Sequence, residues 1–214
     1  MRIELTGVTK GPQGVALPET TLAFSSGRAT LAVAETAQRP TVLGLIASGR
    51  MTPESGTVTI DGETDRRALR RRTALVDAPD VSEPTPSVIV AAVVAEELMF
   101  AGKASDPISA RRWMHAHDLH GVSRLPIADL APTDRLRILL ELATLREGVD
   151  ALILVSPDRH GGDPAEWWNL ALRYASRGFA VLAIVGESSS IALGLPSAAA
   201  NRPRQATLRG EALS

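Results

Sequence analysis

Three short runs of almost uninterrupted apolar residues constrain the fold of this chain most, and they occupy positions 29–33, 151–155 and 180–185. A strand without polar residues has to be covered on both faces, which is typical of strands buried between two layers of helices. Segments with helical patterning alternate with these runs, and the clearest span 133–146 and 164–176. We therefore predict an α/β fold.

The first part of the chain has a different pattern, in which apolar and polar residues alternate. Residues 2–9 alternate in this way, 21–24 form a second short strand pattern, and 57–60 end in the hairpin-type turn Asp61–Gly62. Alternation predicts strands with one buried face, so an antiparallel β region is expected here. The other predicted elements are a helix at 41–47 and strands at 74–76 and 206–210.

Residues 84–132 contain few strand signals and two segments with helical patterning, 87–101 and 110–120. We interpret 84–132 as a helical subdomain inserted into the α/β core. A chain of 214 residues is long enough for one sizeable domain with such an insertion, so 1–214 is expected to form a single domain.

The composition excludes several classes of function. The chain has no cysteine, which excludes disulfides, thiolate metal sites and a cysteine nucleophile. Its formal net charge of −1 provides no bulk attraction to nucleic acid or anionic lipid. The longest apolar run, 88–95, is far too short to span a bilayer, and no signal-peptide core follows Met1. These observations predict a soluble, cytoplasmic protein with no nucleic-acid partner.

Three local clusters have simple structural explanations. The arginines within 66–72 have no interleaved aromatic residue, so a solvated surface or a protein contact is favoured over a nucleic-acid patch. Side chains two positions apart on a helix point to opposite sides, so we expect no metal site at His115 and His117 or at the nearby His120. The adjacent Trp167 and Trp168 point about 100° apart on a helix, so one can pack inward while the other stays near the surface. An exposed tryptophan would be a candidate for an interface, but core packing is the simpler expectation.

The order of the segments resembles a known family. The stretch PESGTVTIDG at 53–62 resembles the sequence that follows the phosphate-binding helix in the nucleotide-binding subunits of ATP-binding-cassette (ABC) transporters. Further segments resemble that family's landmarks in the same order, and they lie at 70–76, 130–137, 152–157, 163–166 and 177–185. The resemblance covers roughly residues 2–210. It implies a P-loop NTPase-like ABC ATPase core with an antiparallel β subdomain and an inserted α-helical subdomain.

The phosphate-binding loop departs from that family. A P-loop needs glycines that let backbone N–H groups approach phosphate oxygens, a lysine for the phosphate charge, and a hydroxyl for Mg²⁺. The resemblance places Ala34 and Arg39 at the two glycine positions and Pro40 at the lysine position. Proline provides neither a charge nor an N–H group, and Glu35 adds negative charge near the anion.

Two residues of this loop are candidates for cofactor binding. Thr41 matches the family's hydroxyl position and is a candidate ligand of Mg²⁺ or phosphate, although a helix N-cap is the simpler role for it. Arg39 replaces the lysine charge if the register shifts by one residue. Thr41 and Arg39 are the cofactor-binding residues that the sequence predicts, for ATP with Mg²⁺ if any cofactor binds.

The remaining catalytic positions of the family also hold other residues. The Q-loop glutamine position holds Ala78, or Asp77 if the register shifts. The signature segment at 130–134 contains a proline that removes an N–H donor and an aspartate that repels phosphate. The positions of the two Walker B acids and the switch histidine hold Val155, Ser156 and Gly186. Phosphoryl transfer depends on charge stabilisation and positioning, so we predict no catalytic residue.

We therefore predict a degenerate ABC-type ATP-binding subunit, a pseudo-ATPase, that acts as a structural or regulatory partner of a membrane transport complex. Its expected partner is a transmembrane permease-type subunit, and a second copy or another ABC subunit is a further candidate. The resemblance places the permease contact in 87–101, where packing on the subdomain core is an equally simple explanation. Through its partner the protein is expected at the inner face of the cell membrane.

The alternative is a working ATP-binding subunit of an ABC transporter. Such a subunit would hold the nucleotide in an unusual pocket, or it would supply half of a composite site.

Overall fold

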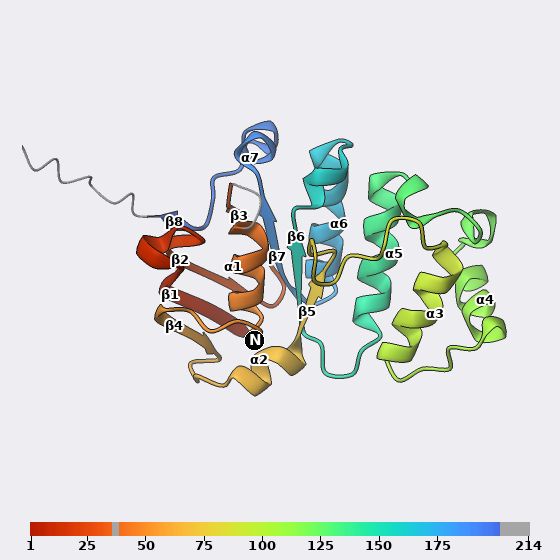
Figure 1. The fold of residues 1–214 in the computed structure, drawn as a ribbon, viewed down its shortest axis with the longest axis horizontal. Helices are drawn as coiled ribbons and strands as arrows, with labels where there is room; N and C mark the ends of the chain where they lie inside the picture. The colour runs from red at the N-terminus through yellow and green to blue at the C-terminus, as the bar shows by residue number, and fades with distance from the viewer. Residues whose placement is uncertain (36–38, 202–214) are drawn as a thin grey trace, which may run out of the picture.

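The computed structural model describes residues 1–35 and 39–201. Two four-stranded sheets form its centre, and helices cover them (Figure 1). One sheet is antiparallel and the other is parallel. The predicted α/β fold and the predicted antiparallel region near the start of the chain are therefore confirmed.

The parallel sheet contains all three apolar runs. Its strands, in spatial order, are β3 (Ala29–Val33), β7 (Ala180–Val185), β6 (Ala151–Val155) and β5 (Thr73–Val76). Every residue of β6 and β7 is buried, because helices cover both faces of the sheet.

Alternate residues of β6 face two different apolar cores. Ile153 belongs to the apolar cluster that contains the buried residues of α1 (Arg39–Ala47), whereas Leu152 belongs to the cluster that contains those of α5 (Pro132–Thr144) and α6 (Pro164–Ser176). Successive side chains of a strand point to opposite faces, which is why an unbroken apolar run fits this place.

The antiparallel sheet covers the core on the α1 side. Its strands, in spatial order, are β4 (Ser55–Ile60), β1 (Arg2–Lys10), β2 (Leu17–Ser25) and β8 (Ala200–Asn201). Ile3, Leu5 and Phe24 point inward and join Leu43 of α1 in one apolar cluster.

The helices α3 (Val90–Phe100) and α4 (Pro107–Ala116) lie beyond α5, far from the antiparallel sheet (Figure 1). α4 begins three residues before the predicted start at 110, because the Asp106 carboxylate accepts hydrogen bonds from the backbone N–H groups of Ile108 and Ser109. The buried residues of α3 and α4 belong to the same apolar cluster as α5. The limits 84–132 of an inserted subdomain stay a prediction.

Two helices were not predicted. α2 (Arg66–Arg72) carries the clustered arginines and buries only Leu69, and α7 (Glu187–Leu193) follows the end of β7. Seven residues are too few to show a clear helical period, so neither was visible in the sequence. The predicted strand at 206–210 lies outside the described residues.

None of the helices within 1–35 and 39–201 is both long enough and apolar enough to cross a bilayer.

We predict that Gly56 is required where β4 passes close to β1. A Cβ at Gly56 (φ 79°) would overlap the backbone of Thr6 and Gly7, whereas a Cβ at Gly62 (φ 88°) would meet no atom within 4 Å. Gly62→Ala should lower the free energy of unfolding by about 1–2 kcal/mol, the cost of left-handed backbone. Gly56→Ala should lower it by about 1–3 kcal/mol more, because of the overlap. Urea unfolding measures both, and equal losses would contradict the close approach.

Candidate functional site

The carboxyl ends of the parallel strands form the candidate site. Ligands of open α/β sheets bind in the crevice outside these strand ends. The chain leaves β3 at Ala34, β5 at Asp77, β6 at Ser156 and β7 at Gly186, so the four following loops meet at one edge of the sheet. α1 also begins at this edge, immediately after the loop that follows β3.

A buried ion pair lies at the β5 end of this edge. Arg135, in the first turns of α5, binds both carboxylate oxygens of Asp77, with Nη2 2.7 Å from Oδ1 and Nε 3.1 Å from Oδ2. Asp77 is 3% exposed and Arg135 is 4% exposed. Two parallel N–H···O bonds between a guanidinium and a carboxylate are the strongest geometry for such a pair. The pair joins the end of β5 to the start of α5.

Three further residues complete this group, which we call the Asp77 cluster (Asp77, Glu83, Arg135, Arg159 and His160). Arg159 Nη2 lies 2.7 Å from Glu83 Oε2 and 3.2 Å from Asp77 Oδ1. His160 Nε2 lies 3.0 Å from Asp77 Oδ2. The two carboxylates and the two guanidiniums balance each other in charge. The guanidiniums of the cluster are therefore already paired and are not available to the phosphates of a ligand.

Arg159 of the Asp77 cluster also contacts the backbone at two residues with unusual conformations. Asp77 (φ 54°) and Ser156 (φ 48°) are both in the left-handed region, which costs about 1–2 kcal/mol for each residue that is not glycine. Arg159 Nη1 donates to the carbonyl oxygens of Asp77 and Val155, the residues at or next to these two positions. Side-chain contacts thus stabilise the turns by which the chain leaves β5 and β6.

The protonation of Asp77 follows from the same contacts. Burial by itself would raise the pKa of Asp77. The hydrogen bonds from His160 and Arg135, together with the charges of Arg159 and Arg135, outweigh burial and hold this pKa well below its usual range. Asp77 is therefore ionised at neutral pH and cannot act there as a general acid.

Two carboxylates accept hydrogen bonds from backbone N–H groups at the start of α7. Asp158 Oδ2 accepts hydrogen bonds from Gly186 N at 3.0 Å and from Ser189 Oγ at 2.8 Å. Glu35 Oε1 accepts a hydrogen bond from Glu187 N at 2.7 Å. These donors are therefore already paired with the protein's own anionic groups.

The predicted cofactor residues lie at the first turn of α1. Arg39 is half-buried and its Nε donates to the carbonyl oxygen of Val15 at 3.4 Å, and Thr41 is half-buried two residues later. The cavity beside Arg39 and Glu35 has a volume of about 30 Å³, close to the space of one water molecule. The part of the predicted loop at 36–38 lies outside the described residues. Arg39 and Thr41 stay predictions as cofactor ligands.

The histidines at 115, 117 and 120, in α4 and directly after it, have different ring partners. His117 stacks on Trp113 with ring centroids 4.0 Å apart, whereas the ring of His115 lies 5.8 Å from that of His120. In the part of the chain that the structure describes, no group of three or more histidine, aspartate or glutamate side chains could hold a metal ion.

The sequence did not reveal most of the Asp77 cluster. Asp77 was considered only as a displaced Q-loop residue, and Arg159 and His160 were not singled out. The available signal was a group of charged residues directly after the buried strand at 151–155. Asp134, expected to face phosphate, is exposed and pairs with Arg137 at 3.4 Å.

Comparison with solved structures identifies the fold. An ATP-binding subunit of an ABC transporter superposes with a TM-score of 0.60 at 16% identity, over 89% of this chain and 82% of that chain. A nucleotide-free ATP-binding cassette from an ABC transporter superposes with a TM-score of 0.61 at 13% identity, over 91% of this chain and 85% of that chain. The protein cbiO1 from Clostridium perfringens is part of the ABC transporter complex cbiONQ. It superposes with a TM-score of 0.61 at 18% identity, over 86% of this chain and 77% of that chain. This chain has the fold of an ABC transporter ATP-binding subunit.

The likeness is one of fold alone, because the identities lie between 13% and 18%. The sequence matches no protein-family profile. It also matches no curated protein.

We predict that Asp77→Asn strongly destabilises the protein. The substitution keeps the side-chain volume but leaves Arg135 as a buried guanidinium without its counter-charge, which should lower the free energy of unfolding by about 3–5 kcal/mol. The matched control is Asp134→Asn, because the Asp134 side chain is 57% exposed and also pairs with an arginine. That variant should change the free energy of unfolding by less than about 1 kcal/mol. Urea unfolding compares the two, and similar losses would contradict the central role of the Asp77–Arg135 pair.

Proposed function

We propose that this chain is a degenerate ABC-type subunit that does not hydrolyse ATP and that supports a membrane transport complex through its surface. The Asp77 cluster is the observation that carries this proposal. It lies at the sheet edge where α/β proteins of this kind bind ligands, and its charges are balanced internally.

The chemistry of the surrounding residues supports the same conclusion. Phosphoryl transfer needs positive charge on the phosphates and a group that orients the attacking water. Pro40 stands at the position of the phosphate-binding lysine, and Glu35 and Asp158 place carboxylates on the N–H groups that open α7. Negative side chains at this place oppose the binding of a triphosphate.

The proposed partner is a transmembrane permease-type subunit, which would hold the protein at the inner face of the membrane. Two large apolar side chains at the end of α3 are exposed, Met99 to 56% and Phe100 to 59%. Exposed apolar residues side by side are typical of a protein contact surface. They lie within the segment 87–101 that the family resemblance assigns to the permease contact.

A second candidate function is nucleotide binding without hydrolysis, as part of a composite site with another ABC subunit. The Arg39 guanidinium favours it, because within residues 1–35 and 39–201 this side chain has only a long hydrogen bond of 3.4 Å, to the carbonyl oxygen of Val15. Arg39 is thus a cation near the start of α1 that a phosphate group could attract.

Calorimetric titration with Mg-ATP decides between these functions. We predict no saturable heat up to millimolar nucleotide from this edge, because the charges of the Asp77 cluster are already paired. Saturable binding that is lost in Arg39→Gln would place the nucleotide at the start of α1 and would contradict the proposal that the edge is closed to nucleotide. Saturable binding that is unchanged in Arg39→Gln would place the nucleotide away from the start of α1.

The partner proposal has a separate test. We predict that the double variant Met99→Gln and Phe100→Gln reduces co-sedimentation with membranes of the source cells, because it removes the exposed apolar pair. Ile191→Gln is the matched control, since Ile191 is 72% exposed but lies on α7. Equal co-sedimentation of the double variant and the wild type would contradict docking through the end of α3.

A further inference from the structure

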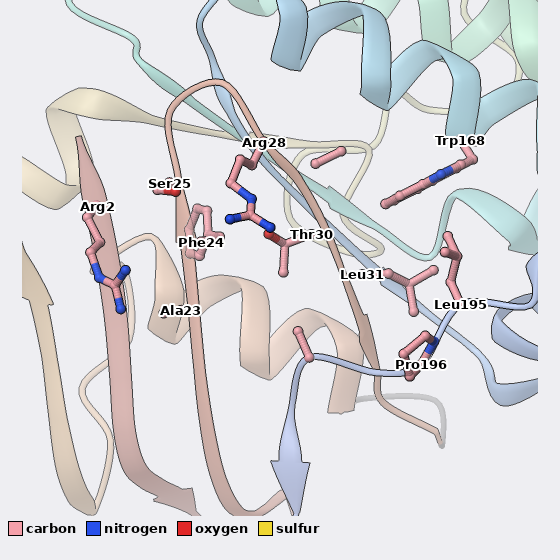
Figure 2. Close-up of a pocket in the computed structure, with 12 residues that line it drawn as sticks. Arg2, Ala23, Phe24, Ser25, Arg28, Thr30, Leu31, Trp168, Leu195 and Pro196 are labelled. Carbon is pink, nitrogen blue, oxygen red and sulfur yellow. The ribbon is translucent and has the colours of Figure 1, made fainter.

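A cavity lies beside the start of β3. The Asp77 cluster lies at the other end of the parallel strands, after β5. β2 and β3 diverge after the turn that joins them, and the chain from Leu195 to Ala198 closes the space between them (Figure 2). The cavity has a volume of about 420 Å³, which is in the range of small-molecule sites. α6 contributes Trp168 to its wall.

Two unpaired strand edges border this cavity. On the side of β3 away from β7, Ala198 N donates to the carbonyl oxygen of Leu31, and Ser197 Oγ accepts a hydrogen bond from Val33 N. On the side of β2 away from β1, the described part of β8 pairs with Thr20 and Thr21. Within the described residues, the edges at 23–25 and 29–30 therefore have no strand partner, and backbone groups at such edges require other hydrogen-bond partners.

The charge of the cavity is positive. Its lining includes Arg2 and Arg28 and no acidic residue. Figure 2 shows the Arg28 side chain extending into the space between β2 and β3. The Arg28 guanidinium forms no hydrogen bond or ion pair with any residue that the structure describes, whereas Arg2 uses Nη2 for a bond of 2.8 Å to Glu4. Hydroxyl groups of Ser25 and Thr30 add polar partners.

The opposite wall is apolar and planar. Trp167 is buried in the core and Trp168 is half-buried, an arrangement that the helical spacing of this pair allows. The indole of Trp168 projects from α6 toward the cavity, beside Leu195 and Pro196 (Figure 2). An indole face favours stacking with a planar ring.

We propose that this cavity binds a small organic anion that contains a planar ring. The ring stacks on Trp168, and the anionic group pairs with Arg28 and with the guanidinium nitrogens of Arg2 that bind no described residue. Guanidinium groups recognise carboxylate and phosphate groups through the same paired N–H bonds, so the shared chemistry is a ring that carries either group. This site uses none of the residues that carry the proposed function, so each proposal can fail without the other.

The indole N–H signal of Trp168 in a two-dimensional ¹H–¹⁵N spectrum tests this site. Comparison with Trp168→Phe assigns the signal among the three tryptophans. Phenylacetate and phenyl phosphate are the probes with a ring and an anion, benzyl alcohol keeps only the ring, and acetate and inorganic phosphate keep only the anion. We expect a saturable shift with at least one of the first two, and affinity lower by roughly tenfold or more for the other three. Whichever of phenylacetate and phenyl phosphate binds with the higher affinity shows whether the site prefers a carboxylate or a phosphate.

Three variants connect the signal to the proposed contacts. Arg28→Gln should weaken binding of the aromatic anion by roughly tenfold, and Arg28→Lys should retain part of it. Arg67→Gln is the matched control, because Arg67 is exposed on α2 and does not line the cavity. The absence of any saturable shift, equal affinity for benzyl alcohol, or unchanged affinity in Arg28→Gln would each overturn the proposal.

Discussion

The bidentate contact between Asp77 and Arg135 determines what the carboxyl edge of the parallel sheet can do. It joins residues that are 58 positions apart in the sequence, one at the end of β5 and one at the start of α5. A buried ion pair gains little stability relative to apolar side chains of the same volume, because both charges lose their hydration. Its effect here is geometric, since it fixes where a helix begins relative to a strand end.

The rest of the edge follows from this contact. Arg159 and His160 also contact the carboxylate oxygens of Asp77, and Arg159 donates to the carbonyl oxygen of this left-handed residue. The apolar strands do not depend on these contacts, because their burial comes from helices on both faces. A fold of this kind can therefore persist while the chemistry at its strand ends changes.

Sequence patterns predicted the parts of the fold that depend on local periodicity. The apolar runs gave β3, β6 and β7 at or close to their observed limits, because full burial leaves no choice of residue type. α7 was missed because its segment, ESSSIAL, has no apolar period. Arg135 was missed for a different reason: an arginine in an amphipathic helix is expected on the surface, and its partner 58 positions earlier cannot be found from spacing.

The two ends of the parallel sheet differ in how their polar groups are satisfied. At the carboxyl end, the side chains of Asp77, Asp158 and Glu35 are paired with arginine or backbone donors of the same chain. At the other end, beside β3, the Arg28 guanidinium has no hydrogen-bond or ion-pair partner among the described residues, and two stretches of strand edge have no strand partner there. Polar groups that line a cavity need water or a ligand, whereas groups that satisfy each other exclude both. The balance of satisfied and unsatisfied groups therefore favours ligand binding at the cavity between β2 and β3 over the strand ends where this fold would place it.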